Sequence, residues 1–196
     1  MCAMKRTGAL WAALAAALMA GCVPSLHPIC GDDDALFDAG LLGVWKADGA
    51  GKETLTFLDA GNRHYRVAYV EGNGEHGLFD VRLTRIGGAL FLDAYPERAD
   101  VAGNGYYRLH LVSAHTFMKV AATNGTMALA PVAAKWLGEL LADDPQALRH
   151  EALDKDTILM TASTAELRKF LAEYQATAEA FEQPTRWRRE AGGRAP

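Results

Sequence analysis

The chain of 196 residues has few cysteines, no excess of positive charge and only one long apolar run. Its three cysteines are Cys2, Cys22 and Cys30, so a fold held by several internal disulfides is excluded. The formal charge of −4 at pH 7 argues against a nucleic acid as partner. Beyond Cys22, no apolar run approaches the length of a membrane-spanning helix.

The chain also lacks the motifs of the common catalytic sites. No histidine belongs to a His-Glu-x-x-His pattern, and Gly-x-Ser-x-Gly is missing. Residues 72–77 match Gly-x-Gly-x-x-Gly, but we interpret Gly72-Asn73-Gly74, like Gly103-Asn104-Gly105, as a turn and not as a phosphate-binding loop. The best polar constellation that the predicted strands offer consists of Tyr65, Tyr69, Tyr107, His110 and His115, with Arg66, Arg82 and Arg108. Solvent-facing sheet positions explain the three arginines, and His110 shares a face with Arg108, so we interpret it as a surface residue and not as a general base. We therefore predict no catalytic residue, no cofactor and no enzymatic activity.

One short stretch combines residue types that bind metals. His27, Cys30 and the acidic residues 32–34 together offer imidazole, thiolate and carboxylate ligands. A structural metal site needs a second group of ligands, and the sequence does not provide one. We predict a solvated linker with an isolated thiol here rather than a metal site.

The one long apolar run lies at the start of the chain. Lys5 and Arg6 precede a stretch of Ala, Leu, Trp and Met that extends from Gly8 to Ala20, and Gly21-Cys22 follows. A basic start, a short apolar segment and small residues before a cut are typical of an export signal. The alternatives are an ordinary cleaved signal with a chance cysteine, and an N-terminal helix that is not cleaved.

The end of this signal resembles the lipobox of bacterial lipoproteins, although Met19 occupies the position where those proteins usually carry Leu. The resemblance implies that Cys22 receives a diacylglyceryl group and becomes the mature N-terminus. Two acyl chains hold a protein stably on a membrane, whereas one does not. By resemblance to Gram-negative sorting, Val23 favours the outer membrane, facing the periplasm. Without residues 1–21 the chain has 175 residues, of which 18 are basic and 24 acidic, and a formal charge of −6.

After the cysteine, residues 22–40 contain Pro24, Pro28 and Gly31 and follow neither helical nor strand periodicity, which predicts a lipidated tether. Gly43 and Trp45 then form a Gly-x-Trp motif that resembles the first strand of lipocalins, in which the Trp closes one end of the barrel. The starting sequence 22–28 (Cys-Val-Pro-Ser-Leu-His-Pro) together with this motif resembles a group of bacterial lipoproteins without an established activity.

Period-two alternation of apolar and polar residues recurs between residues 42 and 130. It is clearest where Phe79, Val81 and Leu83 alternate with polar neighbours. Asn73-Gly74 and Asn124-Gly125 are strong hairpin signals. We predict strands over 42–46, 53–58, 64–70, 79–84, 89–95, 106–112, 115–121 and 126–130. About eight short strands with hairpin turns predict an antiparallel meander that forms a lipocalin-like barrel or a strongly curved sheet.

The last third of the chain changes to a helical period. An apolar stripe follows Pro131, and Asp144-Pro145 can start a short helix that continues to His150. A strand is predicted over 156–162. Ser163 and Glu166 then match a capping box, with an apolar stripe behind it. The predicted fold class is thus mainly β (β-rich α+β), with two to three C-terminal helices packed on the sheet. The predicted domain spans 41–175, and residues 176–196 are predicted to be a poorly ordered tail.

These observations favour a non-enzymatic, membrane-anchored lipoprotein of the cell envelope. Eight strands enclose an interior that is either filled by side chains or holds one small ligand. In the first case the protein is an envelope scaffold or assembly lipoprotein with a protein partner. In the second, which we favour, it binds a lipid or another small apolar or amphiphilic ligand. The partners expected are the membrane, through the N-terminal lipid, and one of these two, with no nucleic acid and no metal.

Overall fold

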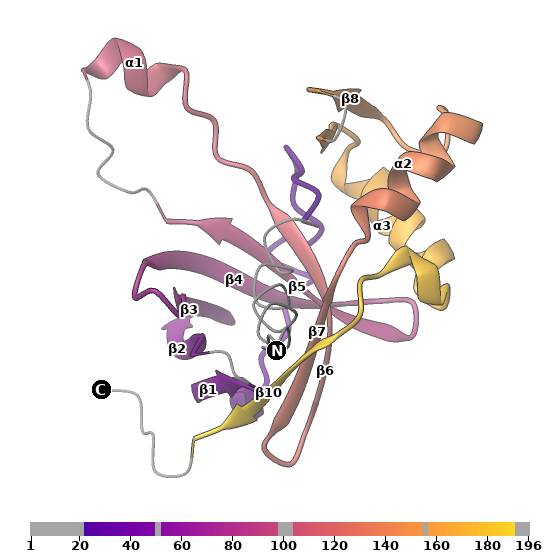
Figure 1. Ribbon diagram of the computed structural model, residues 1–196. Coiled ribbons are helices and arrows are strands. Elements are labelled where there is room, and N and C mark those ends of the chain that lie inside the picture. The colour runs from indigo at the N-terminus through magenta and orange to yellow at the C-terminus, as the bar shows by residue number, and fades with distance from the viewer. Residues whose placement is uncertain (1–21, 50–51, 98–103, 155–156, 191–196) are drawn as a thin grey trace, which may run out of the picture.

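A computed structural model describes residues 22–49, 52–97, 104–154 and 157–190, and the predicted signal peptide over 1–21 lies outside the described residues (Figure 1). Eight antiparallel strands close a barrel in the order β1, β2, β3, β4, β5, β6, β7, β10. The fold class predicted from the sequence is confirmed. The strands are β1 (Gly43–Ala47), β2 (Thr54–Gly61), β3 (His64–Val70), β4 (His76–Ile86), β5 (Ala89–Pro96), β6 (Thr116–Thr123), β7 (Thr126–Pro131) and β10 (Thr185–Arg189).

Tight turns join most neighbouring strands, and their residues explain the antiparallel order. Asn124 and Gly125 both have positive φ, at 36° and 84°, as the type I′ hairpin between β6 and β7 requires. Asn62 and Arg63 take the same conformation between β2 and β3, with φ of 50° and 65°. These turns keep β2 to β7 in a meander in which each strand pairs with the next along the chain.

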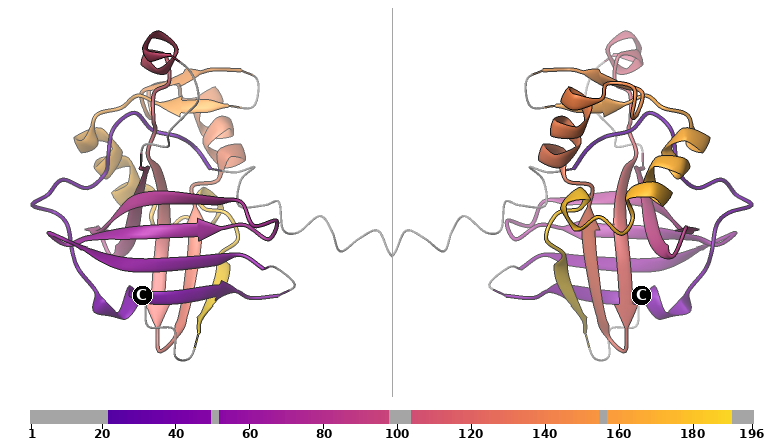
Figure 2. Two further views of the ribbon diagram at one scale, coloured as in Figure 1. Left: turned by 90° about the vertical axis from the view of Figure 1, so that its left-hand side faces the viewer. Right: turned by 90° about the vertical axis from the view of Figure 1, so that its right-hand side faces the viewer.

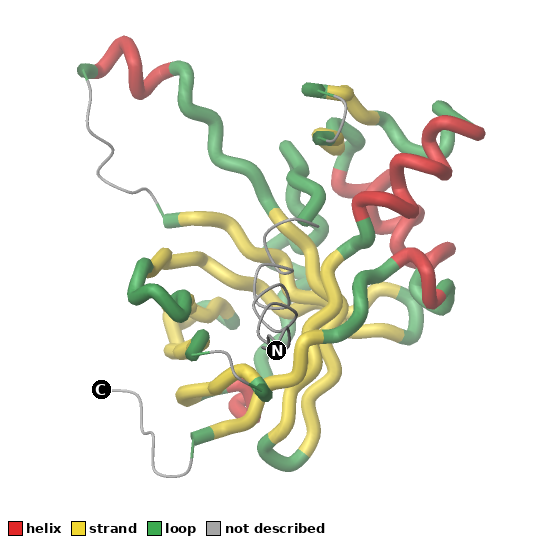
Figure 3. Tube along the Cα trace, in the orientation of Figure 1, coloured by secondary structure: helices red, strands yellow, loops and turns green. Residues whose placement is uncertain are grey.

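A helical insertion of residues 132–184 separates β7 from β10, the strand that closes the barrel. It contains α2 (Ala134–Asp143), a two-stranded sheet of β8 (His150–Ala152) and β9 (Ile158–Met160), α3 (Thr164–Tyr174) and the 3₁₀ helix η2 (Ala178–Ala180). Figures 1 and 3 show α2 and α3 together on one side of the barrel. At the start of α3 the Ser163 hydroxyl and the Glu166 side chain form the predicted capping box.

The molecule has two apolar cores, one on each side of the barrel wall. The inner core lies inside the barrel and includes the side chains of Phe57, Val81 and Trp187. The outer core lies between the wall and the helical insertion, where Phe91 and Phe117 pack with residues of α2 and α3. The apolar stripe of each helix therefore covers the outer face of the sheet rather than entering the barrel. Figure 2 shows the helical layer and the barrel from two sides.

The predicted tether is ordered and lies against the barrel. We call residues 22–38 the strap. Ser25 exchanges backbone hydrogen bonds with His115 at 2.9 and 2.8 Å, and Leu26 N donates to Met160 O of β9 at 2.9 Å. Further along, Leu36 N donates to Leu83 O of β4 at 2.7 Å. The strap then reaches η1 (Ala39–Leu41), which leads into β1. A solvated linker is therefore the wrong description of these residues.

The predicted tail also needs correction, because residues 185–189 form β10. Trp187 is 1% exposed and pairs with Ala47 of β1 and Met127 of β7, so this strand closes the barrel. Arg186 and Arg188 flank Trp187 and face solvent. The tail was predicted to be poorly ordered from its composition, which is rich in arginine. The period-two alternation of this short strand was therefore overlooked. Residues 191–196 lie outside the described residues.

Two further predicted elements differ from the structure. Residues 106–112 were expected to form a strand, but residues 105–109 form the short helix α1 (Gly105–Leu109). The Asn104 side chain accepts a hydrogen bond from Tyr107 N at 2.9 Å, which caps this helix. The short helix expected up to His150 is replaced by turns and by β8. No helix within the described ranges is long and apolar enough to cross a membrane.

Candidate ligand-binding site

The two ends of the barrel differ in what their loops carry. At one end, which we call the hairpin rim, short turns at 62–63, 87–88 and 124–125 join the strands. At the other, the insertion rim, the connections are longer and include the segment 97–115 with α1 and the helical insertion 132–184. Successive connections of an antiparallel barrel emerge alternately at its two ends. The long connections 97–115 and 132–184 both lie at the insertion rim.

The half of the barrel next to the hairpin rim is filled by aromatic side chains whose polar atoms are bonded. Trp45 is 1% exposed, and its Nε1 donates to Leu41 O at 2.8 Å. The hydroxyl of Tyr65, a buried residue, accepts from Asp38 N at 2.6 Å and donates to Asp38 O at 3.2 Å. The guanidinium of Arg189 lies 4.7 Å from the centre of the Trp45 ring. η1 and the end of the strap thus close this half.

The half next to the insertion rim contains a partly open cavity of about 230 Å³. Its walls come from the rim-side ends of the strands and are apolar, with side chains such as Leu55, Val67, Phe79, Val81, Met118 and Leu129. An engineered apolar cavity of about 150 Å³ stays dry and binds benzene. A volume and lining of this kind suit a small apolar molecule.

Among the described residues, four polar side chains also line the cavity, and none of these four carries a charge at neutral pH. They belong to Cys22, Tyr69, Thr116 and Trp187. Burial and the nearby carboxylate of Glu182 raise the pKa of the Cys22 thiol, and burial also raises the pKa of Tyr69. The Trp187 Nε1 is buried and has no hydrogen-bond partner among the described residues. The indole N–H of Trp187 is thus a buried donor in apolar surroundings.

Cys22, the predicted lipidation site, lies at this cavity. The chain is docked from the next residue onward, since Val23 is 4% exposed and belongs to the outer core. The partly exposed Cys22 thus has a fixed position at the insertion rim instead of hanging on a flexible linker. Gly43 and Trp45, which form the Gly-x-Trp motif that resembles lipocalins, lie instead at the opposite, filled end of the barrel.

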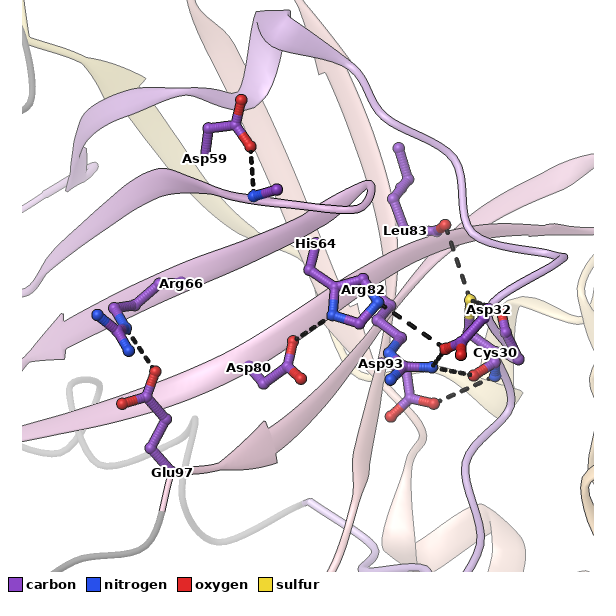
Figure 4. A network of polar contacts seen from close by, with 12 residues as sticks. Cys30, Asp32, Asp59, His64, Arg66, Asp80, Arg82, Leu83, Asp93 and Glu97 are labelled. Carbon is purple, nitrogen blue, oxygen red and sulfur yellow. Dashed lines mark hydrogen bonds and ion pairs between the residues drawn. The ribbon is translucent and has the colours of Figure 1, made fainter.

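A polar cluster on the outer wall is the second site with chemical potential (Figure 4). Asp93 is 2% exposed, and its Oδ2 accepts from Ile29 N at 2.7 Å and Cys30 N at 3.2 Å. Its Oδ1 lies 2.7 Å from His115 Nδ1. Arg82 donates to Asp32 Oδ1 at 2.7 Å and to Cys30 O at 3.3 Å. A pocket of about 390 Å³ borders Asp93, Arg82 and His115.

The contacts of this cluster hold the strap on the barrel. Both oxygens of Asp93 are occupied, and its partners include two backbone amides of the strap. The Cys30 thiol is buried, and its pKa is raised mainly by that burial, so it is held as a thiol and not as a reactive thiolate. An aspartate–histidine pair resembles part of a catalytic triad, but here the nearby cysteine is not activated.

The polar residues singled out from the sequence are dispersed by the fold. Tyr65 lies in the filled half, Tyr69 lines the cavity, and Tyr107, Arg108 and His110 are exposed around α1. The exposed Arg66 pairs with Glu97 at 2.6 Å. Only His115 and Arg82 come together, at the Asp93 cluster. Sequence reasoning missed Asp93 and Trp187. Asp93 was visible as the single charge in an otherwise apolar strand.

The metal-binding residue types in the strap, His27, Cys30 and the acidic residues 32–34, do not come together in a metal site. Among the described residues no group of three or more His, Cys, Asp or Glu side chains is placed to hold one. Asp32 pairs with Arg82, and Asp34 Oδ1 lies 3.5 Å from Arg168 Nη2, while His27 is exposed. Asp32 and Asp34 thus serve as ion-pair partners for arginines of the barrel and of α3.

Comparisons with known protein families, with curated proteins and with solved structures find no match to this chain. Fold and cavity define its class: a closed antiparallel β-barrel of eight strands with an apolar internal cavity.

Proposed function

We propose that this protein binds a small apolar or amphiphilic ligand inside its barrel and has no enzymatic role. The observation that carries this proposal is the cavity of about 230 Å³ in the insertion-rim half, with its apolar walls. A protein interior is normally packed without voids of this size, and filling one with apolar atoms is favourable. In the opposite half the interior is filled by side chains such as Trp45, and a pocket of about 560 Å³ borders Trp45 at the hairpin rim.

We further propose that the protein is a lipoprotein of the bacterial cell envelope, anchored through lipid on Cys22 in the outer membrane and facing the periplasm. The signal-like sequence before Cys22 supports this. Because Val23 is already docked on the barrel, the lipid would hold the insertion rim against the bilayer. The cavity would then face the membrane, from which an apolar ligand can enter without crossing water.

The anchor is tested by Cys22→Ala, with Cys30→Ala as the matched control. We expect the Cys22 variant to move from the detergent-soluble membrane fraction to the soluble fraction, and the Cys30 variant to stay with the membrane. Retention of Cys22→Ala on the membrane would rule out the anchor. A cysteine at the cavity could also affect ligand binding, so each variant is compared in lipid content as well as in location.

The ligand is tested by native mass spectrometry of the full-length protein purified from the envelope, together with solvent extraction of the same sample. We expect a reproducible apolar molecule in addition to the lipid on Cys22. A control that fills the cavity, Val67→Phe, should lose this molecule while keeping the anchor. An empty cavity in the native protein after mild purification would argue against a carrier.

The second candidate function, a scaffold that binds an envelope protein, is favoured by one observation. The segment with α1 stands away from the barrel in Figure 1, and its exposed apolar residues include Tyr106 at 75% and Val112 at 75%. A contiguous patch of exposed apolar side chains is typical of an interaction surface. Crosslinking from residue 106 in intact cells should capture one defined protein if the scaffold hypothesis is right, whereas lipid adducts alone would exclude it.

A further inference from the structure

We propose that the cavity takes up an acyl chain of the lipid on Cys22 of the same molecule, and that an external apolar ligand competes with this chain for the space. Ligand binding then returns the chain to the bilayer and strengthens the anchor. This inference rests on the proposed lipid anchor and ligand-binding function, and it names the first occupant of the cavity. It depends on the fixed position of Cys22 and on the lining and the volume of the cavity.

Cys22 is held at the cavity by the residues that follow it. Cys22 itself belongs to the cavity lining. Two residues later Pro24 O accepts a hydrogen bond from Met160 N at 2.9 Å, and Ser25 exchanges backbone hydrogen bonds with His115 at 2.9 and 2.8 Å. The backbone at Cys22 therefore cannot move far from the cavity without breaking these contacts.

The sulfur of Cys22 is also close to a side chain of the cavity wall. Burial raises the pKa of the Tyr69 hydroxyl most, and charges at Glu53, Glu71 and the Cys22 sulfur raise it further. Tyr69 and Cys22 both line the cavity, so a group attached to this sulfur starts at the insertion rim beside the cavity. A diacylglyceryl group adds a short flexible linker there, and its acyl chains can turn either into the barrel or into the bilayer.

The lining and the volume of the cavity suit part of a hydrocarbon chain. The walls are apolar, with Leu55, Phe79 and Met118 among them, and within the described ranges no Lys, Arg, Asp or Glu lines the cavity. If about 150 Å³ accommodates the six carbons of benzene, the cavity of about 230 Å³ accommodates roughly nine non-hydrogen atoms. The cavity therefore encloses the terminal segment of an acyl chain, and the part next to the glyceryl group crosses the opening.

The covalent link favours this chain over a free lipid. A group that is linked next to a binding site reaches it in an intramolecular step, and a short flexible linker gives a high effective concentration. An acyl chain leaves water whether it enters the bilayer or the barrel, so burial from water alone does not decide between them. Filling the void adds packing contacts that an empty cavity lacks, and this difference favours the barrel.

Uptake of one chain changes the strength of the anchor. A single acyl chain holds a protein only marginally and reversibly on a membrane, whereas two chains hold it stably. A diacylated Cys22 with one chain inside the barrel keeps a single chain in the bilayer. A ligand that takes over the cavity releases the second chain. The ligand-loaded protein is thus firmly attached to the membrane, and the ligand-free protein is weakly attached.

The first test locates the acyl chain directly and needs only the native sequence. Cells that produce the full-length protein are supplied with a fatty acid that carries a photoactivatable diazirine, and the intact mass of the purified protein establishes its lipid on Cys22. After illumination we expect adducts that join the Cys22 peptide to wall peptides, such as those that contain Leu55 and Met118. Methyl hexanoate, a probe of about nine non-hydrogen atoms, should lower their yield about tenfold at ten times its apparent dissociation constant.

The second test measures the strength of the anchor. The diacylated protein, selected by its mass, is partitioned between buffer and vesicles of phosphatidylethanolamine and phosphatidylglycerol. We expect saturating methyl hexanoate to raise the ratio of vesicle-bound to free protein by about tenfold or more, because a second acyl chain enters the bilayer. Val67→Phe, which fills the cavity, is the matched control. It should lack the adducts and bind the vesicles firmly with or without methyl hexanoate.

The outcomes separate this inference from the proposed function. Adducts that place a free phospholipid on the wall peptides, without the Cys22 peptide, would identify a membrane lipid as the occupant, so the inference would be wrong while ligand binding stands. Vesicle binding that methyl hexanoate leaves unchanged, or raises equally in Val67→Phe, would also overturn it. If calorimetry finds no binding of methyl hexanoate even to protein produced without its lipid, the ligand-binding function fails. If the mass shows no lipid on Cys22, the anchor fails and the inference with it.

Discussion

The two buried tryptophans of the barrel, Trp45 and Trp187, show how its two halves differ. Each is 1% exposed and each belongs to the inner core. Trp45 packs in the filled half with its N–H bonded to Leu41 O. Trp187 borders a cavity, and its N–H is unpartnered among the described residues. The filled half is thus closely packed with its indole N–H bonded, whereas the other half contains an unfilled volume and a buried indole N–H without a partner.

The strap produces this asymmetry. Its last residues and η1 lie at the hairpin rim, where Leu41 enters the core and Asp38 bonds to the Tyr65 hydroxyl. Its first residue, Cys22, lies at the cavity. A single segment therefore closes one end and borders the opening of the other. Substitutions in the two halves should consequently affect different properties.

The largest expected effect comes from Trp45→Ala. Removing this side chain from the filled half leaves a large void and an unbonded carbonyl at Leu41, and we expect a loss of about 3–5 kcal/mol in the free energy of unfolding. Urea denaturation measures it. Tyr106→Ala, at an exposed position, serves as control and should change stability by less than about 0.5 kcal/mol. A loss near zero for Trp45→Ala would show that the filled half is not the stabilising one.

The second prediction concerns the attachment of the strap. Asp93→Ala leaves the amides of Ile29 and Cys30 without an acceptor in a buried position, and we expect a loss of about 1–3 kcal/mol. Hydrogen exchange should show faster opening of the strap than of β2 and β3. Asp32→Ala removes an exposed partner of Arg82 and should cost at most about 1 kcal/mol. Equal effects of the two substitutions would mean that Asp93 does not hold the strap.

The sequence predicts more of the filled half than of the open half. Period-two alternation and Asn-Gly turns located β2 to β7 because these signals are local. Trp45 was found because it follows a glycine at the start of a strand. The prediction of about eight strands agrees with the structure although two errors compensate: residues 106–112 form a helix instead of a strand, and β10 was taken for a tail.

The open half depends on contacts between distant parts of the chain. Trp187 of β10 pairs with Met127 and Ala47 in neighbouring strands. The local signal for this strand is a single buried Trp187 between two exposed arginines, which is too short to predict that the strand closes the barrel. The buried role of Asp93 depends likewise on amides of the strap, which lie more than 60 residues earlier in the chain. A sequence pattern reports which face of a strand is apolar, but not whether the enclosed volume is full.

The third prediction compares the same substitution in the two halves. Trp45→Phe removes a bonded N–H and leaves the Leu41 carbonyl unpaired, so we expect a loss of about 1–2 kcal/mol. Trp187→Phe removes an N–H that has no partner, and the relief of that buried polar group should offset part of the lost packing. Thermal or urea unfolding of both variants in parallel measures the difference. If Trp187→Phe is the more costly substitution in the ligand-free protein, its N–H already has a partner.

The smallest expected effect is a pKa change that distinguishes the halves without altering the fold. Burial raises the pKa of both Tyr65 and Tyr69 above the ordinary tyrosine value. Since the protonated form is favoured in the folded state, the associated stability is fully present below the pKa of unfolded tyrosine and is lost as pH rises through the folded value. A ligand in the cavity should exclude water from Tyr69 and raise its pKa further, because desolvation disfavours the tyrosinate. Tyr65 lies in the filled half, so its pKa should not respond.

Ultraviolet titration of the native protein, Tyr65→Phe and Tyr69→Phe, each with and without methyl hexanoate, assigns the two transitions. A ligand-dependent shift that survives in Tyr69→Phe would place the ligand elsewhere than in the open half.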